Sequence, residues 1–134
     1  MKILAIRLKN LASLAGPFEI DFTAEPLASA GLFAITGPTG AGKSTLLDAL
    51  CLALFGAVPR LSNAQVSAKA PDADGEISTG DPRTLLRRGT GEGYAEVDFV
   101  GIDGRRYRAR WEANRAREKA AGKLQASRQS LRDI

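Results

Sequence analysis

The sequence contains no histidine and only one cysteine, Cys51, among its 134 residues. Without histidine, Ser-His-Asp and Cys-His catalytic arrangements and histidine-ligated metal sites are excluded. A single cysteine cannot form an internal disulfide, which fits a reducing compartment. No apolar run approaches the ~20 residues of a membrane span, and Arg7 and Lys9 come too early for a secretory signal. We therefore expect a cytoplasmic protein.

What is present is typical of a soluble globular chain, with 44% hydrophobic and 25% charged residues. The length corresponds to one domain at most, at ~100–200 residues per domain. The net charge of +4 is unevenly distributed, because residues 105–132 hold ten of the 19 basic side chains and two of the 15 acidic ones. Such a segment indicates either an anion-binding surface or an ordinary solvated face.

The first 56 residues predict three strands and a helix. Apolar and polar residues alternate over 3–9 and again over 18–23, which predicts a pair of neighbouring strands. The apolar run at 32–35 predicts a strand buried on both faces, as in a parallel sheet. The Leu- and Ala-rich stretch 43–55 predicts a helix that ends at Gly56 and is deeply buried on nearly all sides.

The remainder divides into an insertion and a basic hairpin with a tail. Residues 57–93 are rich in Pro, Gly and small polar residues and predict a long flexible insertion, with one packed patch at 84–86. Alternation over 94–100 and 105–112 predicts a β-hairpin that turns at Asp103-Gly104. The basic hairpin and its tail together span about 94–134.

Residues 37–44, GPTGAGKS, satisfy the P-loop pattern G-x-x-x-x-G-K-[ST]. Glycines let the backbone curl around a phosphate, and the start of the following helix attracts an anion. Lys43 is the candidate catalytic residue, reaching the β- and γ-phosphates of ATP, and the Ser44 hydroxyl suits Mg²⁺. The predicted nucleotide contacts are Gly37, Pro38, Thr39, Gly40, Ala41, Gly42, Lys43, Ser44 and Thr45.

A hydrolytic site also needs an acidic residue after an apolar strand. No run of four apolar residues in this sequence ends in Asp or Glu, and Asp21 and Asp98 belong to the polar faces of alternating strands. We therefore expect the chain to hold the P-loop part of an ATPase without its catalytic acid.

Several stretches carry a more specific resemblance. Residues 1–22, residues 31–56 and the PRLS of 59–62 closely resemble the N-terminal part of the SbcC family of SMC-like ABC ATPases, and YAEVDF at 94–99 and YRARW at 107–111 match as well. The resemblance implies an α/β P-loop NTPase fold, as the N-terminal half of an ABC-type ATPase head with an antiparallel β subdomain. It also implies a distant C-terminal half that brings the signature motif and the catalytic acid, and a coiled coil between the two halves.

The resemblance further implies an ATP-hydrolysing head in a DNA double-strand-break repair and hairpin-processing exonuclease. Its partners would be a second SbcC protomer, the nuclease subunit SbcD and double-stranded DNA ends, in the cytoplasm at the nucleoid. Relatives often place polar or basic groups after the first strand, in the stretch that matches residues 10–13. Here Asn10 and Ser13 are polar but Ala12 is not, so the sequence departs from the pattern and no nucleotide contact is assigned to this stretch.

Arginines of the hairpin and tail are candidates for sequence-independent contacts with DNA phosphates. The candidates are Arg106, Arg108, Arg110, Arg115 and Arg117. The alternatives are a solvated face or a contact with the C-terminal half of the head. Two other functions also stay open, namely the nucleotide-binding domain of an ABC transporter and a non-catalytic anion-binding fragment.

Overall fold

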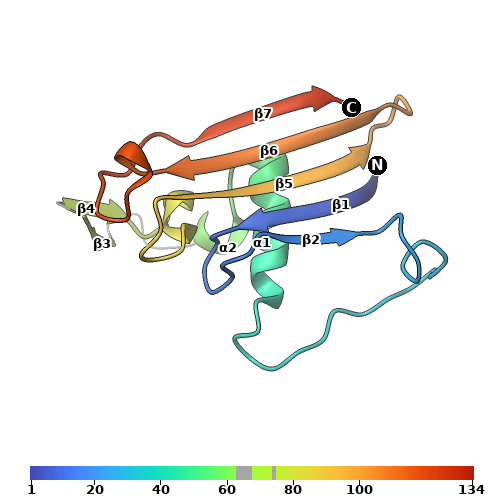
Figure 1. Ribbon diagram of the computed structural model, residues 1–134, viewed down its shortest axis with the longest axis horizontal. Helices are drawn as coiled ribbons and strands as arrows, with labels where there is room; N and C mark the ends of the chain where they lie inside the picture. The colour runs from blue at the N-terminus through green and yellow to red at the C-terminus, as the bar shows by residue number, and fades with distance from the viewer. Residues whose placement is uncertain (63–67, 74) are drawn as a thin grey trace.

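A computed structural model describes residues 1–62, 68–73 and 75–134. Its centre is a five-stranded antiparallel sheet with the strand order β2-β1-β5-β6-β7 (Figure 1). The strands are β1 (Lys2–Lys9), β2 (Phe18–Asp21), β5 (Glu92–Val100), β6 (Arg106–Asn114) and β7 (Arg128–Asp133). The predicted pairing of the first two strands and the predicted hairpin are both confirmed. Gly104 has a φ of 78° in the hairpin turn, as the Asp-Gly pair predicts.

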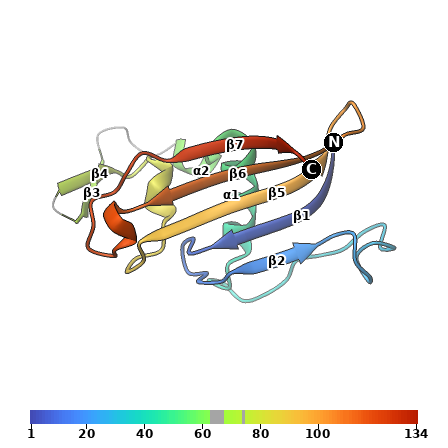
Figure 2. The same cartoon turned by 45° about the horizontal axis from the view of Figure 1, so that its top comes forward.

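Helix α1 (Lys43–Phe55) packs against one face of this sheet and forms the core with it. The side chains of Leu8, Leu52, Val97 and Trp111 are at most 1% exposed between the two layers. The helix ends at Gly56, whose φ of 67° is left-handed and whose N–H donates to the Leu52 carbonyl, as predicted. The other face of the sheet is covered by no described helix or strand (Figure 2), and we call it the open face.

The expectation that α1 is buried on nearly all sides is wrong. Leu47 is 64% exposed and Phe55 is 72% exposed, while Ala49 and Leu52 are fully buried. The physical reason is that the sheet covers one side of the helix only, and no described element packs on the opposite side. An apolar strip of α1 therefore faces outward.

The predicted buried strand at 32–35 is also absent. Leu32 is 93% exposed, and Phe33 and Ile35 are 46% and 48% exposed. A strand buried on both faces needs neighbours, and every strand pair described in this chain is antiparallel and involves other segments. Residues 31–42 instead form an extended arch that leads into α1 (Figure 1), and Phe33 stacks on Phe22 at a centroid distance of 5.3 Å.

The described part of 57–93 is more ordered than a long loop. It contains helix α2 (Pro59–Ser62), a hairpin of β3 (Lys69–Asp72) with β4 (Gly75–Ser78), and a 3₁₀ turn η1 (Pro82–Leu85). The structure corrects the loop prediction here, because short-range pairing is possible even in a Pro- and Gly-rich stretch. The packed patch at 84–86 is confirmed, since Leu85 and Leu86 are 6% and 5% exposed. The remainder of the insertion, 63–67 and 74, lies outside the described residues.

The basic tail contains a strand that periodicity did not reveal. After a 3₁₀ turn η2 (Ala116–Glu118), β7 pairs with β6 along its whole length. All six residues of β7 are exposed, so the strand is held by backbone pairing rather than by an apolar face. Among the described residues, no helix has the length and apolar character needed to cross a membrane.

Candidate functional site

The P-loop residues form a turn at the start of α1 that only glycine permits at two positions. Gly40 has a φ of 84° and Gly42 a φ of 102°, values that side chains disfavour. A Cβ at Gly42 would lie 2.7 Å from the Leu14 side chain. Leu14 therefore packs directly against the backbone where the loop becomes helix, and it fixes the position of that junction.

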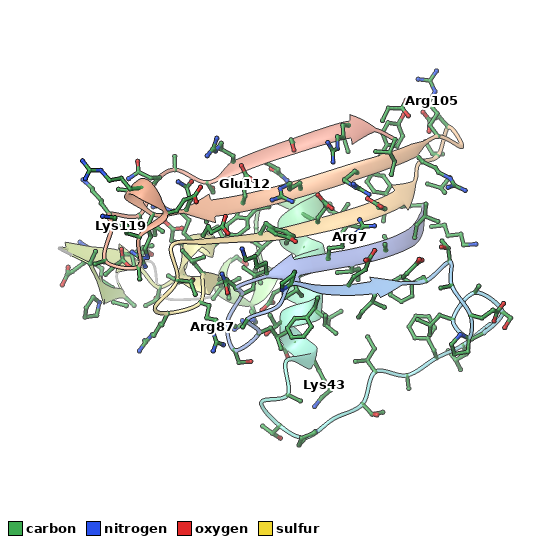
Figure 3. All side chains as sticks on the ribbon, viewed as in Figure 1. Arg7, Lys43, Arg87, Arg105, Glu112 and Lys119 are labelled. Atoms are coloured by element: carbon green, nitrogen blue, oxygen red, sulfur yellow. The ribbon has the colours of Figure 1, made fainter. Side chains whose placement is uncertain are left out.

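Lys43 folds back over the loop that precedes it. Its ammonium donates to the carbonyls of Gly37 at 2.5 Å and Pro38 at 2.9 Å. Figure 3 shows Lys43 at the end of α1, on the side where the arch of residues 31–42 arrives. A positive charge thus stands beside a helix N-terminus whose own N–H groups favour an anion.

A cavity of about 300 Å³ opens between this loop and the loop that follows β1. It is lined by Ser13, Thr39, Gly40, Gly42, Lys43, Ser44 and Thr45. Gly37 and Pro38 contact the Lys43 ammonium instead, and Ala41 donates its N–H to the Pro38 carbonyl. The donor set fits a phosphate group with Mg²⁺, because it combines an ammonium, backbone amides and serine and threonine hydroxyls.

Ser13 is placed beside the predicted loop residues, although the sequence assigned no nucleotide contact to its stretch. Its backbone carbonyl accepts a hydrogen bond from the Arg87 guanidinium at 2.5 Å. The Arg87 backbone N–H in turn donates to the Asn10 carbonyl at 2.9 Å. Sequence reasoning missed Arg87 because it lies within the insertion, although the basic pair Arg87-Arg88 was a visible signal.

The buried acidic residue of α1 is neutralised within the chain. Asp48 is 5% exposed and accepts three hydrogen bonds from Arg60 of α2, at 2.5–3.0 Å.

The two acidic residues that sequence analysis assigned to polar strand faces are Asp21 and Asp98. Asp21 accepts a hydrogen bond from Thr23, and Asp98 lies on the open face of the sheet. The described residues contain no group of three or more His, Cys, Asp or Glu side chains that could hold a metal ion.

Two of the predicted DNA contacts are engaged in ion pairs on the open face. Arg108 contacts Asp98 at 2.6 Å, and Arg110 contacts Glu96 at 3.1 Å. Arg7 of β1 approaches Asp98 from the other side at 2.9 Å. Burial of Asp98 raises the pKa of its carboxyl, but the hydrogen bonds from Arg108 and Arg7 outweigh that effect, so the pKa lies below its ordinary value.

Of the other three predicted DNA contacts, one is in a partly buried ion pair and two have exposed side chains. Arg115 forms an ion pair with Asp72 of β3 at 2.6 Å, and its hydrogen bond lowers the pKa of Asp72. Arg106 and Arg117 have no carboxylate oxygen within 4.0 Å among the residues that the structure describes. The structure therefore does not bring the five arginines together as one free basic ridge.

Comparisons with known proteins show the family to which the chain belongs. The family model described as "AAA domain" matches residues 5–133. The chain is 73% identical over 134 residues to the C subunit of the SbcCD nuclease from Pseudomonas aeruginosa, and 62% identical over 132 residues to the same subunit from Rhodobacter capsulatus. These alignments cover 100% and 98% of the chain, but 11% of each relative.

A more distant relative carries a different name. The chain is 36% identical over 108 residues to "Probable DNA double-strand break repair Rad50 ATPase" of Aquifex aeolicus, an alignment that covers 81% of the chain and 9% of that protein. The chain thus spans about a tenth of the length of the relatives that it matches.

Proposed function

The chain belongs to the AAA domain family, and from this premise we propose that it is the ATP-binding part of the ATPase subunit of an SbcCD-type DNA-repair nuclease. The observation that supports this proposal is the 300 Å³ cavity that Lys43, Ser44 and Ser13 line at the start of α1. An anion in this cavity would meet the helix N-terminus and a lysine charge together. The identity over nearly the whole chain to two SbcCD C subunits supports the assignment to that complex.

Each residue of the site has a distinct task in this proposal. The Lys43 ammonium would exchange a loop carbonyl for the β- and γ-phosphates, and the glycines at 40 and 42 let the backbone amides approach the phosphates closely. The Ser44 hydroxyl would be a ligand of Mg²⁺, which neutralises phosphate charge when it is bound. Arg87 holds the backbone of Ser13 at the opposite wall of the cavity.

The outward apolar surface supports a further part of the proposal, namely that the C-terminal half of the same head packs here. Leu47 and Phe55 of α1 are exposed, as are Leu32 and Ile35 of the arch. Beside them lies a cavity of about 410 Å³, lined mainly by apolar side chains that include Ile3, Ile6, Phe22, Leu27, Phe33 and Leu50. Surfaces of this kind mark protein interfaces.

The remaining partners in the proposal are a second SbcC protomer, the nuclease subunit SbcD and double-stranded DNA ends, at the nucleoid in the cytoplasm.

The chain by itself would hold ATP without turning it over. Phosphoryl transfer to water needs a positioned water, a group that orients it and charge compensation in the transition state. Lys43 and Ser44 supply a phosphate clamp and one metal ligand, while Asp48 is occupied by Arg60. The C-terminal half of the head, added as a second polypeptide, would supply the remaining groups.

Calorimetric titration of the 134-residue chain with Mg·ATP tests the proposal. Charge-assisted contacts are worth ~1.5–3 kcal/mol, so Lys43→Ala lowers the affinity about tenfold or more. The matched control is Lys69→Ala, which removes an exposed lysine from β3. Equal affinity of the wild type and Lys43→Ala would overturn the proposed site.

Phosphate release measured on the same proteins tests the second part. We expect release by the wild-type chain to equal that of Lys43→Ala, and to rise above it when the C-terminal half is added. Turnover by the chain alone near the usual ~1 s⁻¹ of enzymes would show that a catalytic acid lies within these residues.

A further inference from the structure

The charges on the open face of the sheet follow the strand order. Register pairs place the outward side chains of neighbouring strands in rows across the sheet. One such row runs from Glu19 in β2 through Arg7 in β1 and Glu96 in β5 to Arg110 in β6. The sign of the charge alternates at every step, and consecutive members are joined by ion pairs of 2.9–3.3 Å. This part of the face is neutralised by its own side chains, and Figure 3 shows Arg7 within it.

The alternation ends at the last pair of strands. The next row passes from Asp98 in β5 to Arg108 in β6 and then to Arg132 in β7, so two arginines stand directly opposite each other. Like charges in this position destabilise a strand pair. Asp98 already forms ion pairs with Arg7 and Arg108. Arg132 has no carboxylate oxygen within 4.0 Å among the described residues.

Two further positions of β6 and β7 also have too few carboxylates. Glu112 is shared between Arg110 at 3.0 Å and Arg128 at 3.4 Å, and the Arg128 side chain stays 71% exposed. Arg106, at the start of β6, lacks a carboxylate partner in the described part of the chain. We call Arg106, Arg128 and Arg132 the β6–β7 strip.

We propose that the β6–β7 strip binds the phosphate backbone of duplex DNA, which supplies the negative charges that the sheet lacks there. This inference rests on the proposed DNA-repair function. It moves the DNA contact away from Arg108, Arg110 and Arg115, whose ion-paired side chains are only 12–33% exposed, whereas Arg128 shares Glu112 and stays 71% exposed. Arg128 and Arg132 lie outside the set of arginines that sequence reasoning selected.

The dimensions of the strip suit a nucleic-acid backbone. Arg128 lies opposite Glu112, six positions along β6 from Arg106, so the strip extends about 20 Å at ~3.3 Å per residue. Successive phosphates of one DNA strand advance ~3.4 Å along the helix axis, so the strip spans about six of them. Guanidinium groups form two parallel hydrogen bonds to a phosphate.

The contact reads no base sequence. The aromatic side chain of Tyr94 on this face lies beneath the Arg110 guanidinium, whose carbon is 4.0 Å from the ring centroid, so the ring is covered. In the middle of the sheet the arginines are already paired with Glu96 and Asp98, so this part of the face attracts a phosphate backbone less strongly than the strip does. Recognition is therefore confined to the β7 edge and depends on charge.

Fluorescence anisotropy with a labelled blunt duplex tests this inference on the 134-residue chain over a series of salt concentrations. Each phosphate contact contributes about −0.9 to the slope of log K against log salt. The double variant Arg106→Gln and Arg132→Gln therefore flattens the slope by about 1.8 and lowers affinity at low salt. Lys69→Gln is the matched control, because it removes one exposed charge from the separate β3–β4 hairpin, and it leaves the slope unchanged.

The outcomes separate this inference from the proposed function. Arg106 and Arg132 are exposed and have no carboxylate partner within the described ranges, so the double variant keeps the ATP affinity of the wild type. Its thermal midpoint does not fall, because the variant removes the opposed like charges of Arg108 and Arg132. Arg128→Gln alone serves as a second variant that flattens the slope by about 0.9. If both variants keep the wild-type slope of log K against log salt, DNA binding by the β6–β7 strip is contradicted, while the proposed ATP binding is unaffected. Loss of ATP binding by the wild-type chain would overturn the proposed function instead.

Discussion

At the residue scale, Asp98 is a charged side chain that is both buried and ion-paired. It is 6% exposed, yet it lies on the face of the sheet that no described element covers. The explanation is that Arg7 and Arg108 extend over it and shield it from solvent. Ion pairs of partly buried groups are worth more than exposed ones, and removing one partner leaves an uncompensated charge.

The lowered pKa of Asp98 makes stability depend on pH. Its pKa lies below the ordinary 3.8 when the protein is folded, so the unfolded state binds the proton more readily. The carboxylate therefore stabilises the fold above about pH 3.8, and this contribution is lost as the pH falls through the lower, folded-state value. We expect Asp98→Asn to lower the free energy of unfolding at pH 7 and to reduce the further loss on acidification.

Urea unfolding at pH 7 and at pH 3 measures this effect. The gap in unfolding free energy between the wild type and Asp98→Asn narrows at the lower pH. Glu76→Gln, a change at an exposed carboxylate in β4, is the control. A gap of the same size at both pH values would show that the ion pairs of Asp98 carry no pH dependence.

At the element scale, the ion pair between Asp48 and Arg60 connects α1 to α2. Helix α2 has four residues, none of them buried, and it would not hold its place by apolar packing alone. Val58, which is 3% exposed, and the Arg60 side chain keep this segment against α1. The pair thereby sets the direction in which the chain leaves the P-loop helix.

Arg60→Gln leaves the Asp48 carboxylate buried without its cation. Removing one partner of a fully buried pair costs ~3–5 kcal/mol, and since the Arg60 side chain is 52% exposed, we expect a loss of about 2 kcal/mol. Chemical denaturation measures the loss. Adding Asp48→Asn to Arg60→Gln removes the unpaired charge and recovers part of the stability. A single variant as stable as the wild type would show that the pair does not anchor α2.

At the scale of the whole molecule, the balance between buried and exposed apolar surface decides stability. The core lies between one helix and one sheet, and the far side of α1 and the arch of 31–42 leave large apolar side chains in solvent. Ordering the backbone costs ~1–2 kcal/mol per residue regardless of this exposure. The chain alone is therefore expected to be marginally stable.

Thermal unfolding and dye binding measure this directly. We expect a midpoint well below about 60 °C, a broad transition and binding of a hydrophobic dye to the folded chain. The C-terminal half of the head, if it packs on α1 as proposed, raises the midpoint and displaces the dye. A sharp, reversible transition above about 60 °C, at the upper end for ordinary domains, would contradict the expectation of marginal stability.

Local patterns were enough to predict much of the fold. The strands around residues 3–9, 18–23, 94–100 and 105–112 follow from alternation, and the helix and its end at Gly56 follow from composition and a glycine stop. These signals lie within short windows of sequence, so they can be recognised without knowing which other segments each element packs against. Strand β7 was not predicted, because it has no buried face and therefore no apolar alternation. The strand at 32–35 was predicted wrongly, because a buried strand requires neighbouring strands that its own residues do not specify.

The sequence by itself determined the chemistry of the proposed nucleotide site, because eight consecutive residues supply the turn, the lysine and the hydroxyl that a phosphate clamp needs. Only the tertiary structure decided which other residues take part. It placed Ser13 and Arg87 beside the clamp, and it separated the paired arginines from the free ones through contacts such as Arg7 with Asp98, which are 91 positions apart. An arginine is available to a ligand only when no neighbouring carboxylate pairs with it. The register between strands decides which carboxylates are its neighbours, and that register exists only in the assembled sheet.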